Sequence, residues 1–166
     1  TEALLSESQR KEQPTRQTIL QGTALPGSAS AEGTARYVAR ILSRSRQNSR
    51  MEHGYSRFGN SPLTTSRLGF GTYRVDTRDA EHRDALRKAL REGVNLIDTS
   101  TNYMDGDSER LVGSVLRELI KDGELTREEV IVVSKIGYVQ GDNLKQAEKR
   151  EKAGHPYQDM VKYGEG

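Results

Sequence analysis

The chain has 166 residues, of which 33% are hydrophobic and 30% are charged, and its formal net charge at pH 7 is +2. This length suffices for one modest domain, and the small net charge gives no reason to expect nucleic acid or an acidic membrane as a partner. The sequence contains no cysteine, which excludes disulfides, thiol nucleophiles and thiolate metal sites. No apolar run approaches the length that crosses a bilayer, and the first residues lack the pattern of a secretory signal. We therefore predict a cytoplasmic protein with no metal site and no membrane partner.

Composition divides the chain near residue 52. Residues 1–51 are rich in Ser, Thr, Gln, Gly and Arg and hold few large apolar side chains, so they cannot bury enough surface to offset the entropy of ordering. We predict a flexible, disordered extension over residues 1–51 and a folded domain over residues 52–166. One exception lies within residues 33–42, where helical spacing indicates a short helix with the apolar side chains Tyr37, Val38, Ile41 and Leu42.

The folded part is predicted to begin with a hairpin. Two short runs, Tyr55–Phe58 and Leu63–Ser66, flank the turn-rich sequence Gly59-Asn60-Ser61-Pro62. The next run, Leu68–Val75, is predicted to be the first core strand.

Helices and strands are then expected to alternate. The first helix is capped by Asp76 or Thr77 and stops before Gly93, and its apolar stripe consists of Ala85, Leu86, Ala89 and Leu90. Val94–Thr99 is predicted to be the second strand. A second helix over residues 108–121, followed by Gly123, has an apolar face formed by Leu111, Val112, Val115, Leu116, Leu119 and Ile120.

The last elements complete an α/β pattern. A capping box over residues 126–129 precedes Val130–Ser134, an unbroken apolar run that predicts a third strand buried on both faces. Residues 143–153 indicate a charged, solvated helix. The alternation of strands and helices predicts right-handed crossovers and a parallel sheet covered by helices.

Three polar side chains follow the predicted strands. Asp98 ends the second strand, Tyr103 lies in the loop after it, and Lys135 follows the third strand. In parallel α/β architectures the carboxyl ends of the strands aim side chains at one point. A phenol has an ordinary pKa of about 10, and a neighbouring ammonium lowers the pKa of a phenol, so the trio is suited to donate a proton to a reduced carbonyl oxygen. An ordinary ion pair beside a packing tyrosine explains the same spacing equally well.

A glycine pair offers a rival interpretation. Gly69 and Gly71 begin like the glycine-rich turn of a Rossmann-type dinucleotide-binding fold, with Asp98 at a suitable later distance. Arg74 stands where that pattern requires its third glycine, so we keep this fold as the alternative. In the simpler interpretation the glycines relieve crowding in the sheet.

Several motifs in order resemble the amino-terminal part of the aldo-keto reductase family. The resemblance spans roughly residues 55–140 and is carried by residues 55–73, 95–100, 102–103, 108–113 and 133–137. It implies a (β/α)8 TIM barrel that binds an NADPH-type cofactor, whose oxidised form is NADP. It also implies that the enzyme uses this cofactor to reduce aldehydes or ketones to alcohols. By the family pattern Tyr103 donates the proton, Lys135 lowers the pKa of Tyr103, and Asp98 orients Lys135. The resemblance also places Gly71, Thr72 and Tyr73 near the nicotinamide end of the cofactor or the substrate pocket, and the expected cofactor-binding residues are Gly71, Thr72, Tyr73 and Asp98.

The resemblance also implies a catalytic histidine after a fourth strand. His53, His82 and His155 do not occupy that context. We therefore expect an incomplete barrel, the first three strands and two helices, that is inactive on its own. The intact parent is predicted to be an NAD(P)H-dependent oxidoreductase acting on a small-molecule carbonyl substrate. The alternatives are a cofactor-sensing regulatory subunit of a membrane channel and a non-functional fragment. The substrate, the choice of NADPH or NADH and the oligomeric state stay open.

Overall fold

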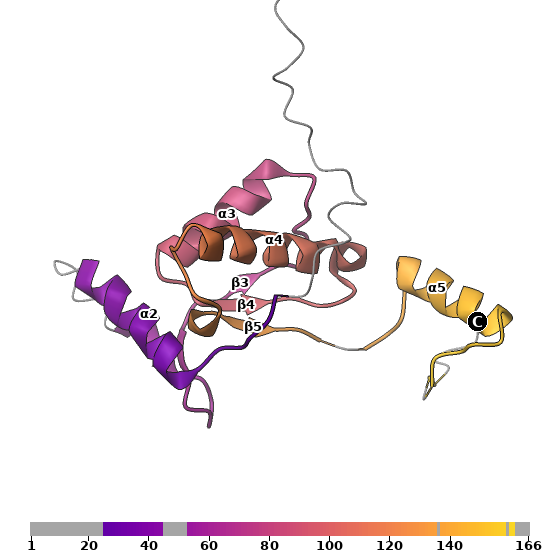
Figure 1. Cartoon of the computed structure of the whole chain (residues 1–166), viewed down its shortest axis with the longest axis horizontal. Helices are drawn as coiled ribbons and strands as arrows, with labels where there is room; N and C mark the ends of the chain where they lie inside the picture. Colours follow the sequence, from indigo (N-terminus) through magenta and orange to yellow (C-terminus); the bar gives the residue numbers. More distant parts are fainter. Residues whose placement is uncertain (1–24, 45–52, 136, 159, 162–166) are drawn as a thin grey trace, which may run out of the picture.

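The computed structural model describes residues 25–44, 53–135, 137–158 and 160–161. A parallel sheet with the strand order β3-β4-β5 is formed by β3 (Phe70–Gly71), β4 (Leu96–Asp98) and β5 (Ile131–Val133). The crossover helices α3 (Ala80–Arg91) and α4 (Asp107–Lys121) lie on one side of this sheet (Figure 1). The predicted α/β class and the alternation of strands with helices are confirmed.

An antiparallel hairpin and four further elements complete the described fold. The hairpin pairs β1 (Tyr55–Arg57) with β2 (Thr64–Ser66), as predicted. Two 3-10 turns connect the core elements, and one more helix lies before the hairpin and one after β5: η2 (Tyr103–Gly106), η3 (Arg127–Glu129), α2 (Ala31–Arg44) and α5 (Gly141–Lys152).

The strands are shorter and less buried than the sequence predicts. The run Leu68–Val75 forms strand only at Phe70 and Gly71, and the Leu68 side chain is 72% exposed. The chain turns after β3, where the Val75 amide donates a hydrogen bond to the Thr72 carbonyl. The prediction that the third strand is buried on both faces is also wrong, because Val132 and Val133 are only half-buried in a sheet whose helices cover one side.

Helix α3 begins later than predicted. Its cap is Asp79, whose carboxylate accepts a hydrogen bond from the Glu81 amide, so the predicted caps Asp76 and Thr77 are wrong. Asp76 instead accepts a hydrogen bond from the Arg78 amide. The end of the helix is as predicted, since Gly93 has a φ of 111°, in the left-handed region that favours glycine.

Helices α3 and α4 supply most of the core. The buried residues of α3 are Leu86 and Leu90, whereas Ala85 of the predicted stripe is exposed. In α4 the predicted face is buried at Leu111, Val112, Val115, Leu116 and Leu119, with Ile120 partly buried against it. Arg83 and Arg87 on α3 both form ion pairs with Glu118 on α4. The two helices are therefore joined by an apolar seam with charged pairs along its border.

Helix α2 belongs to the core. Tyr37 is fully buried, Val38 and Ile41 are buried beside it, and the Tyr37 hydroxyl donates to the carbonyls of Leu90, at 2.6 Å, and Val94, at 3.2 Å. The short helix predicted within residues 33–42 is therefore confirmed and runs over Ala31–Arg44, so the predicted flexible extension does not hold at the ends of this helix. Residues 1–24 and 45–51 of that predicted extension lie outside the described residues.

The capping box before β5 is confirmed, and it also anchors α2. Thr126 and Glu129 exchange the two hydrogen bonds of the box. The buried Glu129 carboxylate also accepts a hydrogen bond from Arg40 on α2 at 2.8 Å. Helix α2 is thus held to η3 by a charged pair whose carboxylate is buried, as well as by apolar packing.

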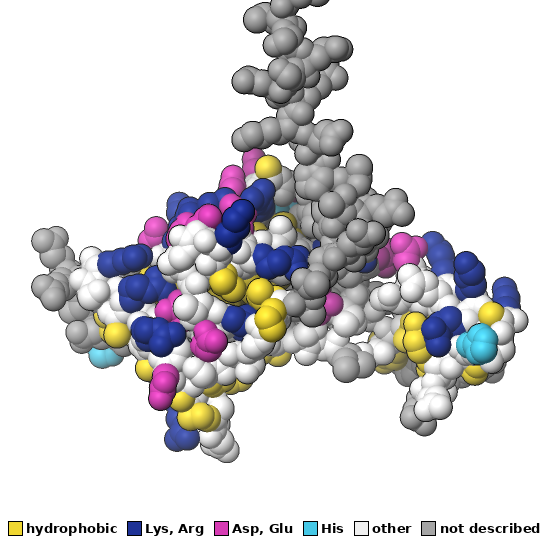
Figure 2. All heavy atoms as spheres, in the orientation of Figure 1, with side chains coloured by type: hydrophobic (Ala, Val, Ile, Leu, Met, Phe, Trp, Pro, Cys, Tyr) yellow, Lys and Arg dark blue, Asp and Glu magenta, His cyan; other side chains and the backbone are white. Residues whose placement is uncertain are grey.

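Helix α5 projects away from the remaining described elements (Figure 1). Its side chains are exposed except at Ala147, and Lys and Arg side chains cover part of it (Figure 2). The predicted charged helix over residues 143–153 is confirmed with slightly earlier bounds. No helix in the described part of the chain combines the length and the apolar content that crossing a bilayer requires.

Candidate active site

The three parallel strands end at one edge of the sheet, and two of the predicted residues meet there. Asp98 is the last residue of β4, and Lys135 follows β5. The Lys135 ammonium donates hydrogen bonds to Asp98 Oδ1 at 2.6 Å and to the Thr99 carbonyl at 3.0 Å. The predicted contact between Asp98 and Lys135 is therefore present, and the Thr99 carbonyl is a second acceptor that the sequence did not indicate.

Tyr103 joins this pair from the loop after β4. The Lys135 ammonium lies 5.0 Å from the centroid of the Tyr103 ring. The pKa of Lys135 is raised, first because the Asp98 carboxylate accepts its hydrogen bond and also because the Tyr103 hydroxyl interacts with the same ammonium. The structure thus brings all three predicted side chains together, with the lysine held in its charged form.

The loop that carries Tyr103 has an unusual backbone. Met104 and Asp105 have φ values of 49° and 53°, and Gly106 follows with a φ of 84°, so three successive residues are left-handed. A non-glycine residue in this region costs about 1–3 kcal/mol and persists where the surroundings impose it. Here Asn102 ties the loop to the segment after β5, because its side-chain amide donates to the Tyr138 carbonyl. Tyr103 is therefore fixed by a strained and anchored turn.

The residues after β3 have different roles. The Thr72 side chain is fully buried, and both its amide and its hydroxyl donate to the Asp98 carbonyl, at 3.0 and 3.1 Å. Ser108 at the start of α4 donates in turn to the Thr72 carbonyl at 2.8 Å. Thr72 thus holds the ends of β3 and β4 together, and no sequence motif indicates that Ser108 supports it.

Gly71 and Tyr73 lie open beside this buried threonine. A Cβ at Gly71 would have no atom within 4 Å, and Tyr73 is 66% exposed. The Tyr73 ring meets the Tyr103 ring edge to face, with centroids 5.2 Å apart and an angle of 84° between the planes. The two rings form one aromatic corner next to the Lys135 ammonium.

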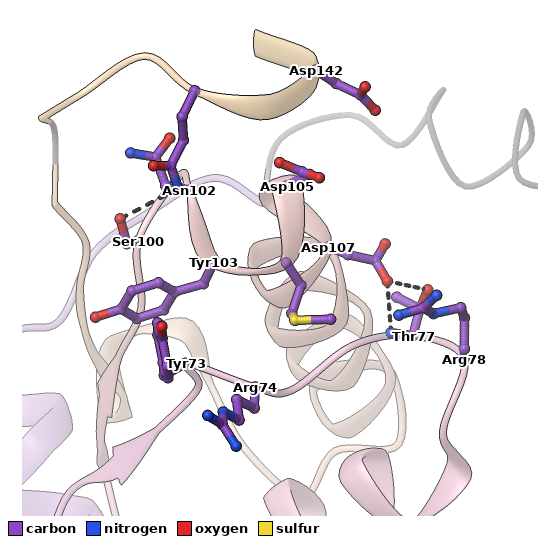
Figure 3. A pocket seen from close by; sticks show the side chains of 12 residues that line it. Tyr73, Arg74, Thr77, Arg78, Ser100, Asn102, Tyr103, Asp105, Asp107 and Asp142 are labelled. Carbon is purple, nitrogen blue, oxygen red and sulfur yellow. Dashed lines mark hydrogen bonds between the residues drawn. The ribbon is translucent and has the colours of Figure 1, made fainter. Parts of the chain in front are cut away.

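This corner borders a cavity of about 860 Å³ (Figure 3). Its walls come from the loop after β3, the loop after β4 and the start of α5, and its lining residues are Tyr73, Arg74, Thr77, Arg78, Ser100, Asn102, Tyr103, Met104, Asp105, Asp107, Gln140 and Asp142. A small molecule in this cavity would have direct access to the Tyr103 side chain. Among the described residues, no group of three or more His, Cys, Asp or Glu side chains is arranged to hold a metal ion.

The sequence model of a family described as "Aldo/keto reductase family" matches residues 67–162. The chain belongs to the aldo/keto reductase family. The resemblance seen in the sequence motifs is confirmed by this match, which covers more than half of the chain.

Curated relatives match about half of the chain. The NADH-specific methylglyoxal reductase of Escherichia coli (strain K12) is 37% identical over 89 residues, which cover 49% of this chain and 26% of that protein. The NADPH-dependent D-xylose reductase of Candida boidinii is 33% identical over 93 residues, covering 55% of this chain and 27% of that protein. The chain therefore spans about a quarter of the length of these relatives.

Two further similarities concern a differently named relative and a solved structure. A protein of Schizosaccharomyces pombe named "Putative voltage-gated potassium channel subunit beta" is 32% identical over 90 residues, which cover 52% of this chain and 25% of that protein. The holo form of an aldo-keto reductase from Bacillus halodurans aligns with a TM-score of 0.46 and 28% identity, covering 53% of this chain and 27% of that chain.

The open part of the site fits one end of a nicotinamide cofactor. A flat ring can approach the strand end at Gly71 because no side chain fills the space there, and the exposed Tyr73 ring offers a stacking surface. Asp98 and Lys135 lie at the neighbouring strand ends. Thr72 is fully buried and hydrogen-bonded, so it contributes to this surface only by holding the Asp98 backbone in place.

The structure contradicts the Rossmann-type alternative. In that fold the glycine-rich turn opens directly into a helix whose amino end faces the pyrophosphate. Here Gly71 is part of β3, and α3 begins only at Ala80, after a loop. The glycine pair therefore lacks the helix that a phosphate-binding turn requires.

Proposed function

We propose that this chain is part of an NAD(P)H-dependent oxidoreductase that reduces an aldehyde or ketone to an alcohol, with Tyr103 as the proton donor. The observation that carries the proposal is the contact of one ammonium, Lys135, with both Asp98 and the Tyr103 side chain at the open edge of the sheet. Membership of the aldo/keto reductase family supports the same chemistry.

Three residues have separate roles in the proposed reaction. A nicotinamide cofactor held beside Gly71 and Tyr73 would supply the hydride for the carbonyl carbon, and the carbonyl oxygen would then require one proton. Tyr103 donates that proton from its hydroxyl, and the Lys135 ammonium stabilises the phenolate that forms. Asp98 keeps Lys135 charged and oriented, with the ammonium held between the Asp98 carboxylate and the Thr99 carbonyl. One hydride and one proton convert the carbonyl into an alcohol.

The cofactor is proposed to be a nicotinamide dinucleotide that rests on Gly71 and Tyr73, next to Asp98. Relatives of this chain are named both as an NADH-specific and as an NADPH-dependent reductase. We propose NADPH as the cofactor because the sequence motifs resemble those of the family. Rates measured with NADPH and with NADH test this choice.

The described strands and helices are proposed to be the first part of a (β/α)8 barrel. The family resemblance implies a catalytic histidine, and the histidines of the described chain lie elsewhere. His82 on α3 faces Asp76 and Asp79, His53 precedes the hairpin, and His155 follows α5. We therefore propose that the 166 residues alone do not turn over substrate. A cytoplasmic location also stays a proposal.

A second candidate is a cofactor-sensing regulatory subunit of a membrane channel. It is favoured by the similarity to the Schizosaccharomyces pombe protein named as a channel beta subunit. The same three residues are compatible with both functions, so turnover separates them. A subunit that binds NADPH without reducing any aldehyde supports the second candidate.

The deciding experiment measures aldehyde-dependent oxidation of NADPH and NADH by the full-length protein. We expect turnover, and we expect Tyr103→Phe to reduce kcat by about 10²-fold or more because the proton donor is lost. Tyr157→Phe is the matched control, since that exposed tyrosine lies beyond α5, beside Arg150. Equal rates for the wild type and Tyr103→Phe would overturn the assignment of Tyr103.

A further inference from the structure

Arg74, on the wall of the cavity, has no ion-pair partner among the residues that the structure describes. Its guanidinium carbon lies 5.9 Å from the centroid of the Tyr73 ring, and its side chain is exposed. Arg78, the other arginine of the cavity, donates two hydrogen bonds to the Asp76 carboxylate, at 2.5 and 3.2 Å. The positive charge of Arg78 is thus neutralised locally, and that of Arg74 is available to a ligand.

Each acidic residue of the cavity contacts a neighbouring part of the protein. Asp107 accepts hydrogen bonds from the amide and the hydroxyl of Thr77, both at 2.8 Å, and Asp142 accepts one from Lys145 at 3.0 Å. Asp105 lies against the start of α5, so close that a Cβ at Gly141 would be 1.9 Å from its carboxylate oxygen.

Figure 3 shows Arg74 on the opposite side of the two tyrosine rings from Asp105 and Asp142. The third carboxylate of the cavity, Asp107, forms an ion pair with Arg110 at 3.6 Å. Arg74 is therefore the arginine of this cavity that has no ion-pair partner among the described residues.

Arg74 is connected to the reacting group through one aromatic ring. Tyr73 contacts the Arg74 guanidinium on one side and the Tyr103 ring on the other, with 5.2 Å between the ring centroids. A linear molecule whose carbonyl oxygen faces the Tyr103 hydroxyl can therefore run along the exposed Tyr73 ring and end at Arg74. The ring supplies an apolar surface for a carbon chain, and the cation–π contact orders the guanidinium.

We propose that Arg74 binds a carboxylate of the substrate, so that the site prefers aldehydes carrying an acid group at the far end of a carbon chain. A guanidinium presents its donors in a planar fork that matches a carboxylate with two parallel hydrogen bonds. This inference rests on the proposed function and names its substrate class. Arg74 acts as a specificity residue and takes no part in the proton transfer.

The test uses the full-length protein and pairs of linear aldehydes, each pair consisting of an ω-carboxylate and its methyl ester. We expect the wild type to favour the acid by about tenfold in kcat/KM, equivalent to about 1.4 kcal/mol. Arg74→Leu is expected to abolish the preference by lowering kcat/KM for the acid while that for the ester stays unchanged. Arg74→Lys is expected to restore part of it, because an ammonium keeps the charge but loses the fork.

Arg78→Leu is the matched control, because Arg78 lines the same cavity but is paired with Asp76. It is expected to retain the preference for the acid. Turnover of both members without preference, or a preference unchanged in Arg74→Leu, overturns this inference and leaves the proposed function intact. No turnover of either member of any pair overturns the proposed function and this inference with it.

Discussion

Ser66 and Asn95 hold each other through two reciprocal hydrogen bonds. The Ser66 backbone N–H donates to Asn95 Oδ1 at 2.8 Å, and the Asn95 backbone N–H donates to the Ser66 hydroxyl at 3.1 Å. The Asn95 side chain also donates to the carbonyls of Thr64, at 3.0 Å, and Glu129, at 3.3 Å. One buried amide therefore joins the hairpin, the amino end of β4 and the turn before β5, opposite the edge that carries Asp98 and Lys135.

The first prediction concerns the stability contributed by this amide. Asn95→Ala removes the side-chain partner of three backbone groups, two of them in buried hydrogen bonds, and we expect the free energy of unfolding to fall by about 3 kcal/mol. Urea unfolding of the chain, followed by circular dichroism, measures the change. Asn60→Ala, in the exposed hairpin turn, is the control and is expected to change stability little. A loss at Asn95 no larger than at Asn60 would contradict the role of the amide.

The second prediction compares two glycines within helices. A Cβ at Gly33 of α2 would lie 2.4 Å from the Glu128 carbonyl oxygen, which is backbone and cannot move freely. A Cβ at Gly113 of α4 would meet only the end of the Arg117 side chain, at 3.7 Å. We expect Gly33→Ala to destabilise the chain by about 1–3 kcal/mol and Gly113→Ala to stabilise it by up to about 1 kcal/mol. Thermal unfolding gives both signs, and stabilisation by Gly33→Ala would show that α2 does not pack so closely on η3.

The third prediction concerns alkaline pH. Burial raises the pKa of Tyr37, so the folded state holds the phenol proton more tightly than the unfolded state does. The stability that this provides is complete below the ordinary phenol pKa of about 10 and is lost as the pH rises above it. We expect Tyr37→Phe to cost about 1 kcal/mol at neutral pH and to make the loss of stability above about pH 10 shallower.

Unfolding by urea at a series of pH values tests the Tyr37 prediction. Tyr157→Phe serves as the control, because that tyrosine is exposed. The same steepness in the wild type and in Tyr37→Phe would show that another group sets the alkaline limit, with Tyr55 as the next candidate because burial raises its pKa as well.

The sequence predicted the parts of the fold that local pattern controls. The apolar face of α4, the hairpin turn and the capping box at Thr126 and Glu129 all follow from spacing within a few residues, and the structure confirms them. The length of the first strand failed because Leu68–Val75 has strand composition, whereas β3 is set by its pairing with β4 and by the turn at Thr72.

The position of α2 was out of reach for a different reason. Helical spacing of its apolar side chains predicted the helix itself, but its burial in the core depends on Tyr37 reaching the carbonyls of Leu90 and Val94, which are distant in sequence. At the candidate site, the meeting of Asp98 and Lys135 follows from parallel strand ends. The left-handed Met104 and Asp105 have no sequence signal beyond the neighbouring Gly106, because such strain is imposed by the surroundings.

The last prediction tests the electrostatics of the candidate site without any substrate. Since the Asp98 carboxylate accepts a hydrogen bond from Lys135 at 2.6 Å and raises the pKa of that lysine, Asp98→Asn should lower the pKa of Lys135 toward its ordinary value of about 10.4. Titration of the labelled lysine side chains by NMR measures the change directly. The matched control is Asp142→Asn, which removes the equivalent partner of Lys145 at 3.0 Å and should lower the pKa of Lys145 alone. If Lys135 titrates identically in the wild type and in Asp98→Asn, the carboxylate does not hold the ammonium in solution, and the proposed support for proton donation by Tyr103 is lost.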